Sequence, residues 1–387
     1  MNPSSATAPH SIDESVDGGH LAALAGFDHM TPSRLRHLLR GRTAQEAYAM
    51  AAGEHRPSPA LEAVFSRRSD LRGRWRVEAT RRLPEQCWAD TVAAGVRVIT
   101  PDHAAFPPQL AADPACPAVL FTRGDLASLD ARRVGIIGTR SATQAGRSTA
   151  AKLSAELAEA GVVVLSGLAR GIDASAHRGA LSCPTATPVA VVGNGLDTPY
   201  PKQNSDLWVA LGERGLLLSE WPVGTKPDPF RFPLRNRILA ALTEVLVVVE
   251  SRERGGSLIT AREAISRSVE VMAVPGSVHS RASVGTNKLL ADGALTANDT
   301  ADVLMALGLD HRRAGRARFD VRDPLGGIDV DVYESCRNQP RTIEAIMLLT
   351  GAGIAETAMQ LARLEHTGWL AETGGWFEAV DVWGSLA

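Results

Sequence analysis

Residues 133–177, "RVGIIGTRSATQAGRSTAAKLSAELAEAGVVVLSGLARGIDASAH", contain two short apolar runs with a longer stretch between them. The runs RVGIIG and VVVLSG are rich in β-branched residues, and the stretch that joins them places apolar residues three or four positions apart. Two strands joined by a helix run parallel, because the helix carries the chain back to the starting edge. The stretch therefore predicts an α/β fold.

The same alternation continues to about residue 308. Apolar runs and helical stretches follow in the order TPVAVVG, NSDLWVALGERG, LLLSE, RNRILAAL, EVLVVVE, ITAREAISRS and VEVMAVPG. Alternation of this kind is typical of a parallel sheet with helices on both faces. We expect a Rossmann-like domain over residues 131–308.

The flanking segments have other patterns. We expect a disordered lead over 1–20, a helical domain over 21–88, a connector that packs on the core over 89–130, a basic linker over 309–324 and a winged-helix-like domain over 325–387. In the last of these, helix, helix and hairpin follow one another. Its second helix carries little net positive charge, which favours contact with protein over contact with DNA.

Composition limits the possible classes of protein. The chain has 387 residues and a formal net charge of -2, so any nucleic acid would be bound through a local patch. Its four cysteines form no CxxC or Cys/His cluster, which argues against zinc and disulfides and indicates a reducing cytoplasm. No run reaches membrane-spanning length, and the polar N-terminus does not resemble a signal peptide.

Ligands of open parallel sheets bind beyond the carboxyl ends of the strands. The segments expected at these ends are Gly138-Thr139-Arg140, Ser166-Gly167 through Arg170-Gly171, Gly193-Asn194-Gly195, Ser219-Glu220 and Glu250 to Ser257. They lack GxGxxG spacing and a Walker lysine, so a dinucleotide fits poorly. Separated arginines with glycine and hydroxyl groups favour a polyanion bound without a cofactor.

The loop that carries Arg170 precedes a helix, whose N-terminus attracts anions. We expect Asp173 to be the N-cap of this helix, which leaves Arg170 for an external anion.

The stretch "DPFRFPLRNRILAAL" places arginines 231, 235 and 237 beside Phe232 and Asn236. Arginines can clamp phosphates, and an aromatic ring can stack on a base. In the alternative, Phe232 belongs to the core and the arginines are paired. One of Arg235 and Arg237 is expected to be buried or paired with an acid such as Glu220 or Glu250.

No residue pattern indicates catalysis. His177 follows Asp173 by one helical turn and could be a general base, although a structural role is favoured without a nearby nucleophile. Ser257 is not in a GxSxG elbow. We therefore expect a binding protein, with no catalytic residue and no metal site.

Five motifs in one order resemble the DNA-processing protein A family (DprA, also called Smf). They are SGLARGIDASAH, GNGLDTPYPKQN, GLLLSEWPVGTKPDPFRFPLRNRI, RGGSLITA and AVPGSVHSRASVGTNKLLADGA, within residues 132–307. The resemblance implies an extended Rossmann-like domain, with a SAM/HhH-like helical domain over 21–88. It also implies a dimer that binds single-stranded DNA and helps load the RecA recombinase during natural transformation.

The resemblance also implies site residues. Gly138-Thr139-Arg140 resembles the family's Gly-Ser-Arg phosphate loop, and Arg170, Arg235, Asn236, Arg237 and Arg254 correspond to its DNA-facing surface. Ala241 and Gly256 depart from the usual glycine and serine. The full candidate set is Gly138, Thr139, Arg140, Gly167, Arg170, Gly171, Phe232, Arg235, Asn236, Arg237, Arg254, Gly255 and Ser257.

Two other functions remain open. RGGSLITARE echoes the PGGxGTxxE turn of nucleotide-hydrolysing relatives of this fold, so a nucleotide N-glycoside hydrolase is one alternative. However, its spacing is one residue too long and its leading proline is absent. The other alternative is a dimeric assembly module without DNA binding.

Overall fold

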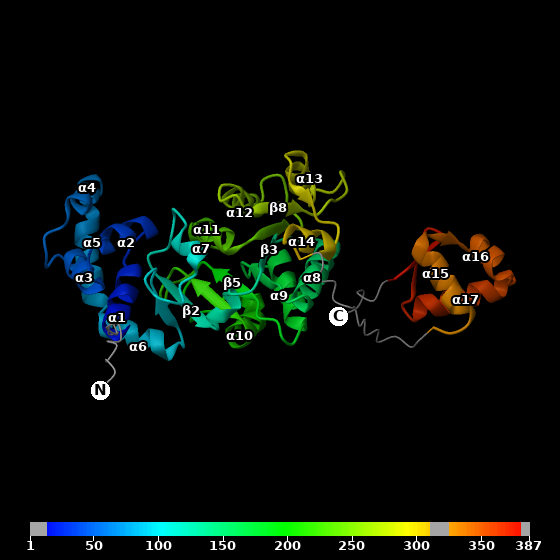
Figure 1. Ribbon diagram of the computed structural model, residues 1–387, viewed down its shortest axis with the longest axis horizontal. Coiled ribbons are helices and arrows are strands. Elements are labelled where there is room, and N and C mark those ends of the chain that lie inside the picture. The colour runs from blue at the N-terminus through cyan, green and yellow to red at the C-terminus, as the bar shows by residue number, and fades with distance from the viewer. Residues whose placement is uncertain (1–13, 310–324, 381–387) are drawn as a thin grey trace, which may run out of the picture. The chain divides into compact units, whose positions relative to one another are not determined.

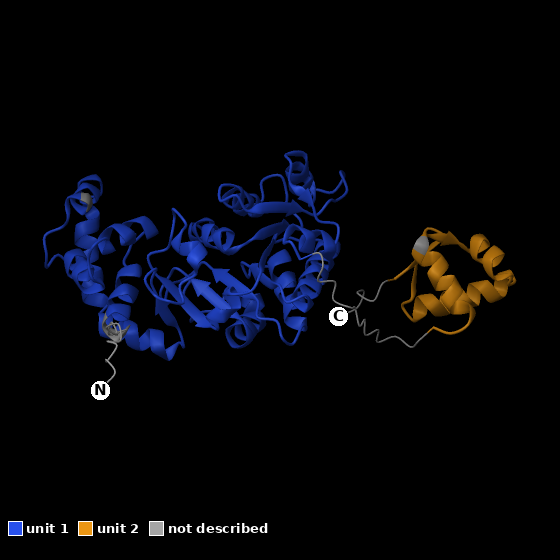
Figure 2. Cartoon of the chain, viewed as in Figure 1, with its two compact units in different colours: residues 1–313 blue, residues 314–387 orange. Residues whose placement is uncertain are grey.

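The structure is a computed structural model that describes residues 14–309 and 325–380 (Figure 1). The chain divides into two compact units, residues 1–313 and 314–387 (Figure 2). The predicted linker over 309–324 lies outside the described residues except for Leu309.

The first unit is built on a nine-stranded sheet within residues 14–309. Its strands are β1 (Arg97–Ile99), β2 (Leu120–Gly124), β3 (Arg133–Ile137), β4 (Val163–Ser166), β5 (Val189–Val192), β6 (Leu216–Ser219), β7 (Val245–Val248), β8 (Glu270–Ala273) and β9 (Leu295–Thr296). They lie in the order β1-β2-β6-β5-β4-β3-β7-β8-β9, and β3 to β9 are parallel. The order reverses at β3, where β4 lies on one side and β7 on the other.

Helices cover both faces of this sheet, which confirms the predicted α/β class. They are α8 (Gln144–Glu159), α9 (Ile172–Ser182), α10 (Ser205–Arg214), α11 (Arg231–Leu242), α12 (Gly256–Ile265), α13 (Val284–Ala291) and α14 (Thr300–Ala306), with short 3-10 helices at Leu126–Leu129 and Lys202–Asn204. Leu239 of α11 packs in one core with Leu246 of β7. Leu157 of α8 packs in another core with Val247. Adjacent residues of β7 thus point to opposite faces, as strand geometry requires.

The segment predicted as a connector contributes to the sheet itself. β2 pairs antiparallel with β6, and β1 pairs antiparallel with β2, so both extend the edge of the sheet. The proline-rich stretch between them forms α7 (Pro108–Ala111). Asp113, just after α7, forms an ion pair with Arg267, with 2.6 Å between the Arg267 Nε and the Asp113 Oδ2. The predicted connector therefore contributes two strands to the sheet in addition to packing on the core.

Six helices precede the sheet. They are α1 (Glu14–Ala25), α2 (Pro32–Leu39), α3 (Ala44–Ala52), α4 (Pro59–Arg67), α5 (Asp70–Arg81) and α6 (Pro84–Ala93), all within the described residues. Thr31 is the N-cap of α2, and its side chain accepts a 3.3 Å hydrogen bond from the Arg34 N–H. The prediction of disorder over 1–20 is wrong for residues 14–20, which belong to α1; residues 1–13 lie outside the description.

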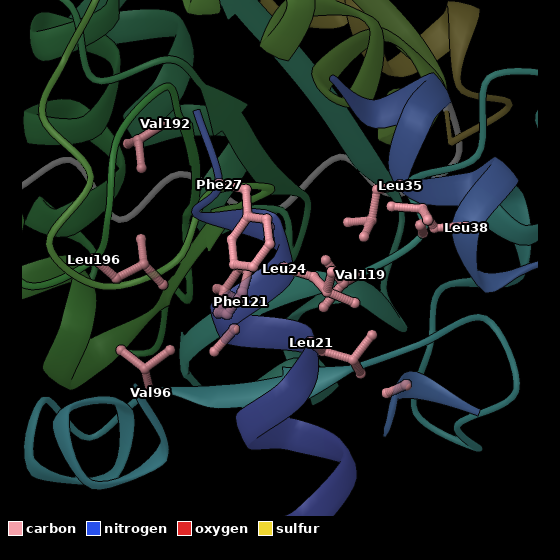
Figure 3. Close-up of a cluster of buried hydrophobic side chains, with 14 of the residues drawn as sticks. Leu21, Leu24, Phe27, Leu35, Leu38, Val96, Val119, Phe121, Val192 and Leu196 are labelled. Atoms are coloured by element: carbon pink, nitrogen blue, oxygen red, sulfur yellow. The ribbon is translucent and has the colours of Figure 1, made fainter. Parts of the chain in front are cut away.

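The N-terminal helices and the sheet share one hydrophobic core. Leu24 and Phe27 of the helical region pack in the same cluster as Phe121 of β2 and Leu196 after β5 (Figure 3). Leu24 and Phe121 are fully buried. Burial of this apolar surface joins residues 21–88 to the Rossmann-like part of the chain, so the two stabilise each other.

The second unit contains α15 (Ile328–Asn338), β10 (Arg341–Thr342), α16 (Ile343–Thr350), α17 (Ile354–His366), β11 (Leu370–Thr373) and β12 (Trp376–Ala379). Its strands form a sheet in the order β10-β12-β11, and its small core includes Val332, Ile346 and Leu361. The two helices and the hairpin follow the predicted order, which is typical of winged-helix modules. The helix α15 was not predicted from the sequence.

Among the described residues, no single helix is long and apolar enough to cross a membrane. By length and composition α16 and α17 could do so together, as a pair bent by 109°.

Substitution of Leu24 by alanine tests the shared core. We expect it to lower the free energy of unfolding of the whole first unit by about 2–5 kcal/mol, because it leaves a cavity where helix and sheet meet. Urea unfolding followed by far-UV circular dichroism measures this change. Val77→Ala, on the exposed side of α5, is the control and should change stability by about 0.5 kcal/mol or less. Separate melting of the helices, with the sheet at its original stability, would contradict the shared core.

Candidate functional site

The loops after β3, β4, β5 and β7 meet at one edge of the sheet, where the strand order reverses. We call them the rim and define them as residues 138–143, 167–171, 193–204 and 249–257. Two adjoining cavities lie along the rim, with volumes of about 520 Å³ and about 400 Å³. This is the place where open α/β sheets bind their ligands.

The larger cavity brings together most of the residues predicted from sequence. It is lined by Gly138, Thr139, Arg140, Gly167, Phe232, Arg235, Asn236, Arg254, Gly255 and Ser257. The smaller cavity adds Arg170 and shares Arg140, Gly167, Phe232 and Arg235. Gly171 lines neither, but its φ of +80° and its close approach to the Thr139 carbonyl require glycine at the start of α9.

Phe232 stands in the wall that both cavities share. Its ring stacks on that of Tyr200, with 5.7 Å between centroids and 25° between planes. The Arg140 guanidinium carbon lies 5.2 Å from the Phe232 centroid. Phe232 is only partly buried, so the alternative that places it in the core is wrong. Phe232 thus forms an aromatic and cationic stack with Tyr200 and Arg140 at the rim.

Sequence reasoning missed the contribution of the loop after β5. Tyr200 and the exposed Lys202 and Gln203 line the smaller cavity. They belong to the motif GNGLDTPYPKQN, whose individual residues were not predicted to bind a ligand. An exposed aromatic residue between prolines was the available signal.

Arg235 lies beneath the two cavities and is only 5% exposed. One of its NH groups donates to the Val191 carbonyl of β5. Burial lowers the pKa of its guanidinium to about 10, against the opposing effect of nearby Asp173. A side chain at position 167 would overlap this guanidinium, which explains the glycine there. Arg235 thus supplies a fixed positive charge under the site.

Asp173 differs from its expected role, because the N-cap of α9 is Gly171. Asp173 lies in the first turn, buried, and its carboxylate accepts a 3.4 Å hydrogen bond from the Ala169 N–H. Burial raises its pKa, while Arg235 and the N–H groups of Ala169, Gly138 and Gly167 oppose the rise. The Asp173 carboxylate therefore stabilises the loop before α9 from its buried side, while Arg170 of the same loop is exposed at the surface.

Arg237 is the clearest correction to the candidate set. Its Nη2 donates to both carboxylate oxygens of Glu220, at 2.5 and 2.6 Å, and Arg237 lines neither rim cavity. Both side chains are largely buried, at 12% and 4% exposure. Residues two apart on a helix point about 200° apart. Arg235 and Arg237 consequently face different sides of α11, and neither is a freely exposed phosphate contact.

His177 and Ser257, the two residues considered for catalysis, are both buried and have environments typical of residues with a structural role. Both ring nitrogens of His177 are buried without a hydrogen-bond partner. Burial lowers the pKa of its imidazole to about 3, and Arg235 adds to the effect. Ser257 donates to Ser251 Oγ at 2.8 Å. Within the described residues there is no cluster of three or more potential metal ligands.

Comparisons with known proteins agree with this fold. The family model for DNA recombination-mediator protein A matches residues 97–308. Protein Smf of Escherichia coli is 32% identical over 299 residues, which cover 75% of this chain and 78% of that protein. This chain therefore belongs to the DNA recombination-mediator protein A family, whose members are called DprA or Smf.

Two solved structures are also similar. DNA processing protein A from Streptococcus pneumoniae has a TM-score of 0.61 at 27% identity, covering 76% of this chain and 98% of that chain. DNA processing protein A from Helicobacter pylori, whose structure describes a single-stranded DNA binding mode, has a TM-score of 0.50 at 30% identity. That match covers 56% of this chain and 96% of that one.

Arg237→Met tests the buried ion pair. We expect it to lower the free energy of unfolding by about 3–5 kcal/mol, because it leaves the Glu220 carboxylate buried without its partner. Chemical denaturation measures the change, and the double variant Arg237→Met/Glu220→Gln should recover part of the loss. Stability equal to that of the unsubstituted chain would contradict the pairing.

His177→Leu tests the neutral buried imidazole. The pKa of His177 is about 6.5 in the unfolded chain and about 3 in the folded one, so unfolding takes up a proton between these values. The contribution of His177 to the free energy of unfolding is complete above the pKa of the unfolded state. As the pH falls below that value, the free energy of unfolding decreases by ~1.4 kcal/mol per pH unit. Urea unfolding across this pH window should show a shallower decline in the variant. An identical pH dependence would show that His177 binds its proton equally in both states.

Proposed function

We propose that this chain binds single-stranded DNA along the rim. The observation that carries the proposal is the stack of Tyr200, Phe232 and Arg140 between two cavities. An aromatic face accepts any base, and arginine can both stack on a base and pair with a phosphate. The relative from Helicobacter pylori, with its single-stranded DNA binding mode, supports the proposal.

The charges of the rim suit a polyanion. Its exposed cations include Arg140, Arg170, Lys202, Arg252 and Arg254. The net charge of the whole chain is -2, so attraction to DNA must come from this local group. Single strands are favoured over duplex, because bases must be unpaired before they can reach a stacking surface inside a cavity.

The proposal extends to a role in recombination. The family is described as a recombination mediator, which supports loading of the RecA recombinase onto the bound strand in the cytoplasm, as part of natural transformation. A homodimer is part of the same proposal, since two rims would hold a longer stretch of strand. The helix α17 carries Glu356 and Glu365 against Arg363, and this lack of net positive charge suits a protein partner better than DNA.

We further propose that the rim binds without turnover and needs no cofactor. The two residues considered for catalysis have structural explanations. His177 is buried, and the Ser257 hydroxyl donates a hydrogen bond to Ser251. Incubation with nucleoside monophosphates should release no free base. Release of base at an enzymatic rate, lost in a rim variant, would favour the hydrolase instead.

Fluorescence anisotropy with an oligothymidylate and a blunt duplex tests the proposed function. We expect the single strand to bind more tightly than the duplex at every salt concentration. Arg140→Ala should weaken single-strand binding and make the slope of log affinity against log salt shallower by about 0.7, as loss of one phosphate contact requires. Its thermal stability should stay near that of the unsubstituted chain, because Arg140 is exposed.

Arg81→Ala is the matched control, because this side chain is 70% exposed on α5 and outside the rim. It should leave affinity and salt slope unchanged. Equal affinity for duplex and single strand, or an unchanged affinity and salt slope in Arg140→Ala, would contradict binding at the rim.

A further inference from the structure

Three strand-to-helix turns meet at the larger cavity, and an internal carboxylate already occupies the one before α8. Glu250, just after β7, accepts hydrogen bonds from the N–H and hydroxyl of Thr143, at 2.9 and 2.5 Å. A side chain on Gly146 would overlap this carboxylate, which shows how closely it approaches the first turn of α8. Its charge complements the positive end of α8, so an external phosphate there would meet a carboxylate.

The turn before α9 is occupied in the same way. The carboxylate of Asp173 faces the N–H groups of Ala169, Gly138 and Gly167, as described above. The Thr139 N–H donates to the Glu250 carbonyl at 2.8 Å. The loop Gly138-Thr139-Arg140, which the resemblance implies to be a phosphate loop, therefore has its amides at 138 and 139 directed at the protein. The Arg140 side chain is exposed and lines both rim cavities, so it is available to a ligand.

The turn before α12 has no such carboxylate. Its N-cap is Gly255, which makes no side-chain capping hydrogen bond. Within the described chain, the N–H groups of Gly256 and Ser257 have no hydrogen-bond acceptor. A Cβ at position 256 would meet no atom within 4 Å, so the space in front of this helix is open. Unsatisfied N–H groups at a helix start attract an anion.

Two largely buried polar residues line the cavity to which this turn belongs. Thr260, one turn into α12, lines the larger cavity and is 4% exposed, and its hydroxyl has no hydrogen-bond partner in the described part of the chain. The Nε of Arg235, which lines the same cavity, is likewise without a partner. Buried polar groups are usually paired, so a donor left free beside a cavity indicates a missing acceptor.

The surrounding charge is positive. Arg140, Arg252 and Arg254 line the larger cavity together with Arg235, against the two carboxylates of Asp173 and Asp228. The Asp228 side chain accepts from the Phe230 N–H at 3.4 Å, so it is engaged within its own loop. Two of these cations, Arg252 and Arg254, lie in the loop just before α12, with the exposed Glu253 between them.

We propose that the N-terminus of α12 is a subsite for one phosphate group of a nucleotide, held by the Gly256 and Ser257 amides and the Thr260 hydroxyl. The inference rests on the proposed function, and it assigns the phosphate to the turn that lacks an internal carboxylate. Thr260 becomes a binding residue that sequence reasoning did not select. The phosphate belongs either to the bound strand or to a free nucleotide, since both present the same group.

Two substitutions in the full chain test the subsite. Thr260→Val keeps the shape of the side chain and removes the hydroxyl, so it should weaken binding of thymidine monophosphate about tenfold. Gly256→Asp places a carboxylate in front of α12, as Glu250 and Asp173 do for their own turns. It should abolish binding of thymidine monophosphate while leaving the melting temperature equal or higher, because an acid at a helix start is favourable.

Thr122→Val is the matched control. Thr122 on β2 is fully buried and its hydroxyl has no hydrogen-bond partner, but it lines neither rim cavity. It should bind thymidine monophosphate with unchanged affinity. In the unsubstituted chain, calorimetry should show binding of thymidine monophosphate and much weaker binding of thymidine, which lacks the phosphate.

The outcomes separate the subsite from the proposed function. Unchanged affinity for thymidine monophosphate and oligothymidylate in both variants overturns the subsite and leaves strand binding intact. Failure of the unsubstituted chain to bind any oligonucleotide overturns the proposed function, while loss of mononucleotide binding in Thr260→Val still supports the subsite. Competition between oligonucleotide and mononucleotide identifies the strand as the source of the phosphate, and simultaneous binding identifies the free nucleotide.

Discussion

The buried guanidinium of Arg235 is the interaction on which the arrangement of the rim depends. It joins the end of β5, through the Val191 carbonyl, to the loop after β4, where Gly167 leaves room for it. Asp173 lies near enough to favour its charge despite full burial. A buried cation is costly in free energy unless hydrogen bonds or an opposite charge compensate for it. The Val191 carbonyl, Gly167 and Asp173 are therefore constrained to stay around the guanidinium. The exposed residues above it are thereby held in position around the two cavities.

Internal carboxylates explain why a Rossmann-like sheet need not bind a dinucleotide. In dinucleotide-binding proteins the pyrophosphate lies at the helix that follows the first strand. Here the Glu250 carboxylate bonds to Thr143 at the start of α8, next to β3. An anion at this edge of the sheet would therefore be bound by the arginines and by the uncapped start of α12. The missing GxGxxG spacing after β3 is consistent with this arrangement.

The fold could be predicted from sequence because its signals are local. The alternation of apolar runs and helical periods located the parallel strands, and the residues just after each strand located the rim. Exact pairings could not be predicted, because they depend on which side of a helix faces the sheet. Spacing indicated that one of Arg235 and Arg237 would be buried or paired with an acid. The structure shows Arg235 buried beneath the cavities and Arg237 paired with Glu220 on another side of α11.

Contacts distant in sequence account for the other differences. Tyr200 reaches Phe232 across 32 positions, and no periodicity reports such a contact. The shared core of Leu24 and Phe121 is equally nonlocal, which is why residues 21–88 were expected to form a domain of their own. Asp173 was expected to be an N-cap because its residue type favours that position. Its burial against three amides is a tertiary effect that outweighs the local preference.

Hydrogen–deuterium exchange, with and without oligothymidylate, tests binding at the rim most directly. The account predicts slower exchange on binding in the loops at residues 138–143, 167–171, 193–204 and 249–257. Exchange in α2 to α5 and in residues 325–380 should stay the same. Protection confined to the N-terminal helices or to residues 325–380, with exchange in the rim loops unchanged, would contradict it.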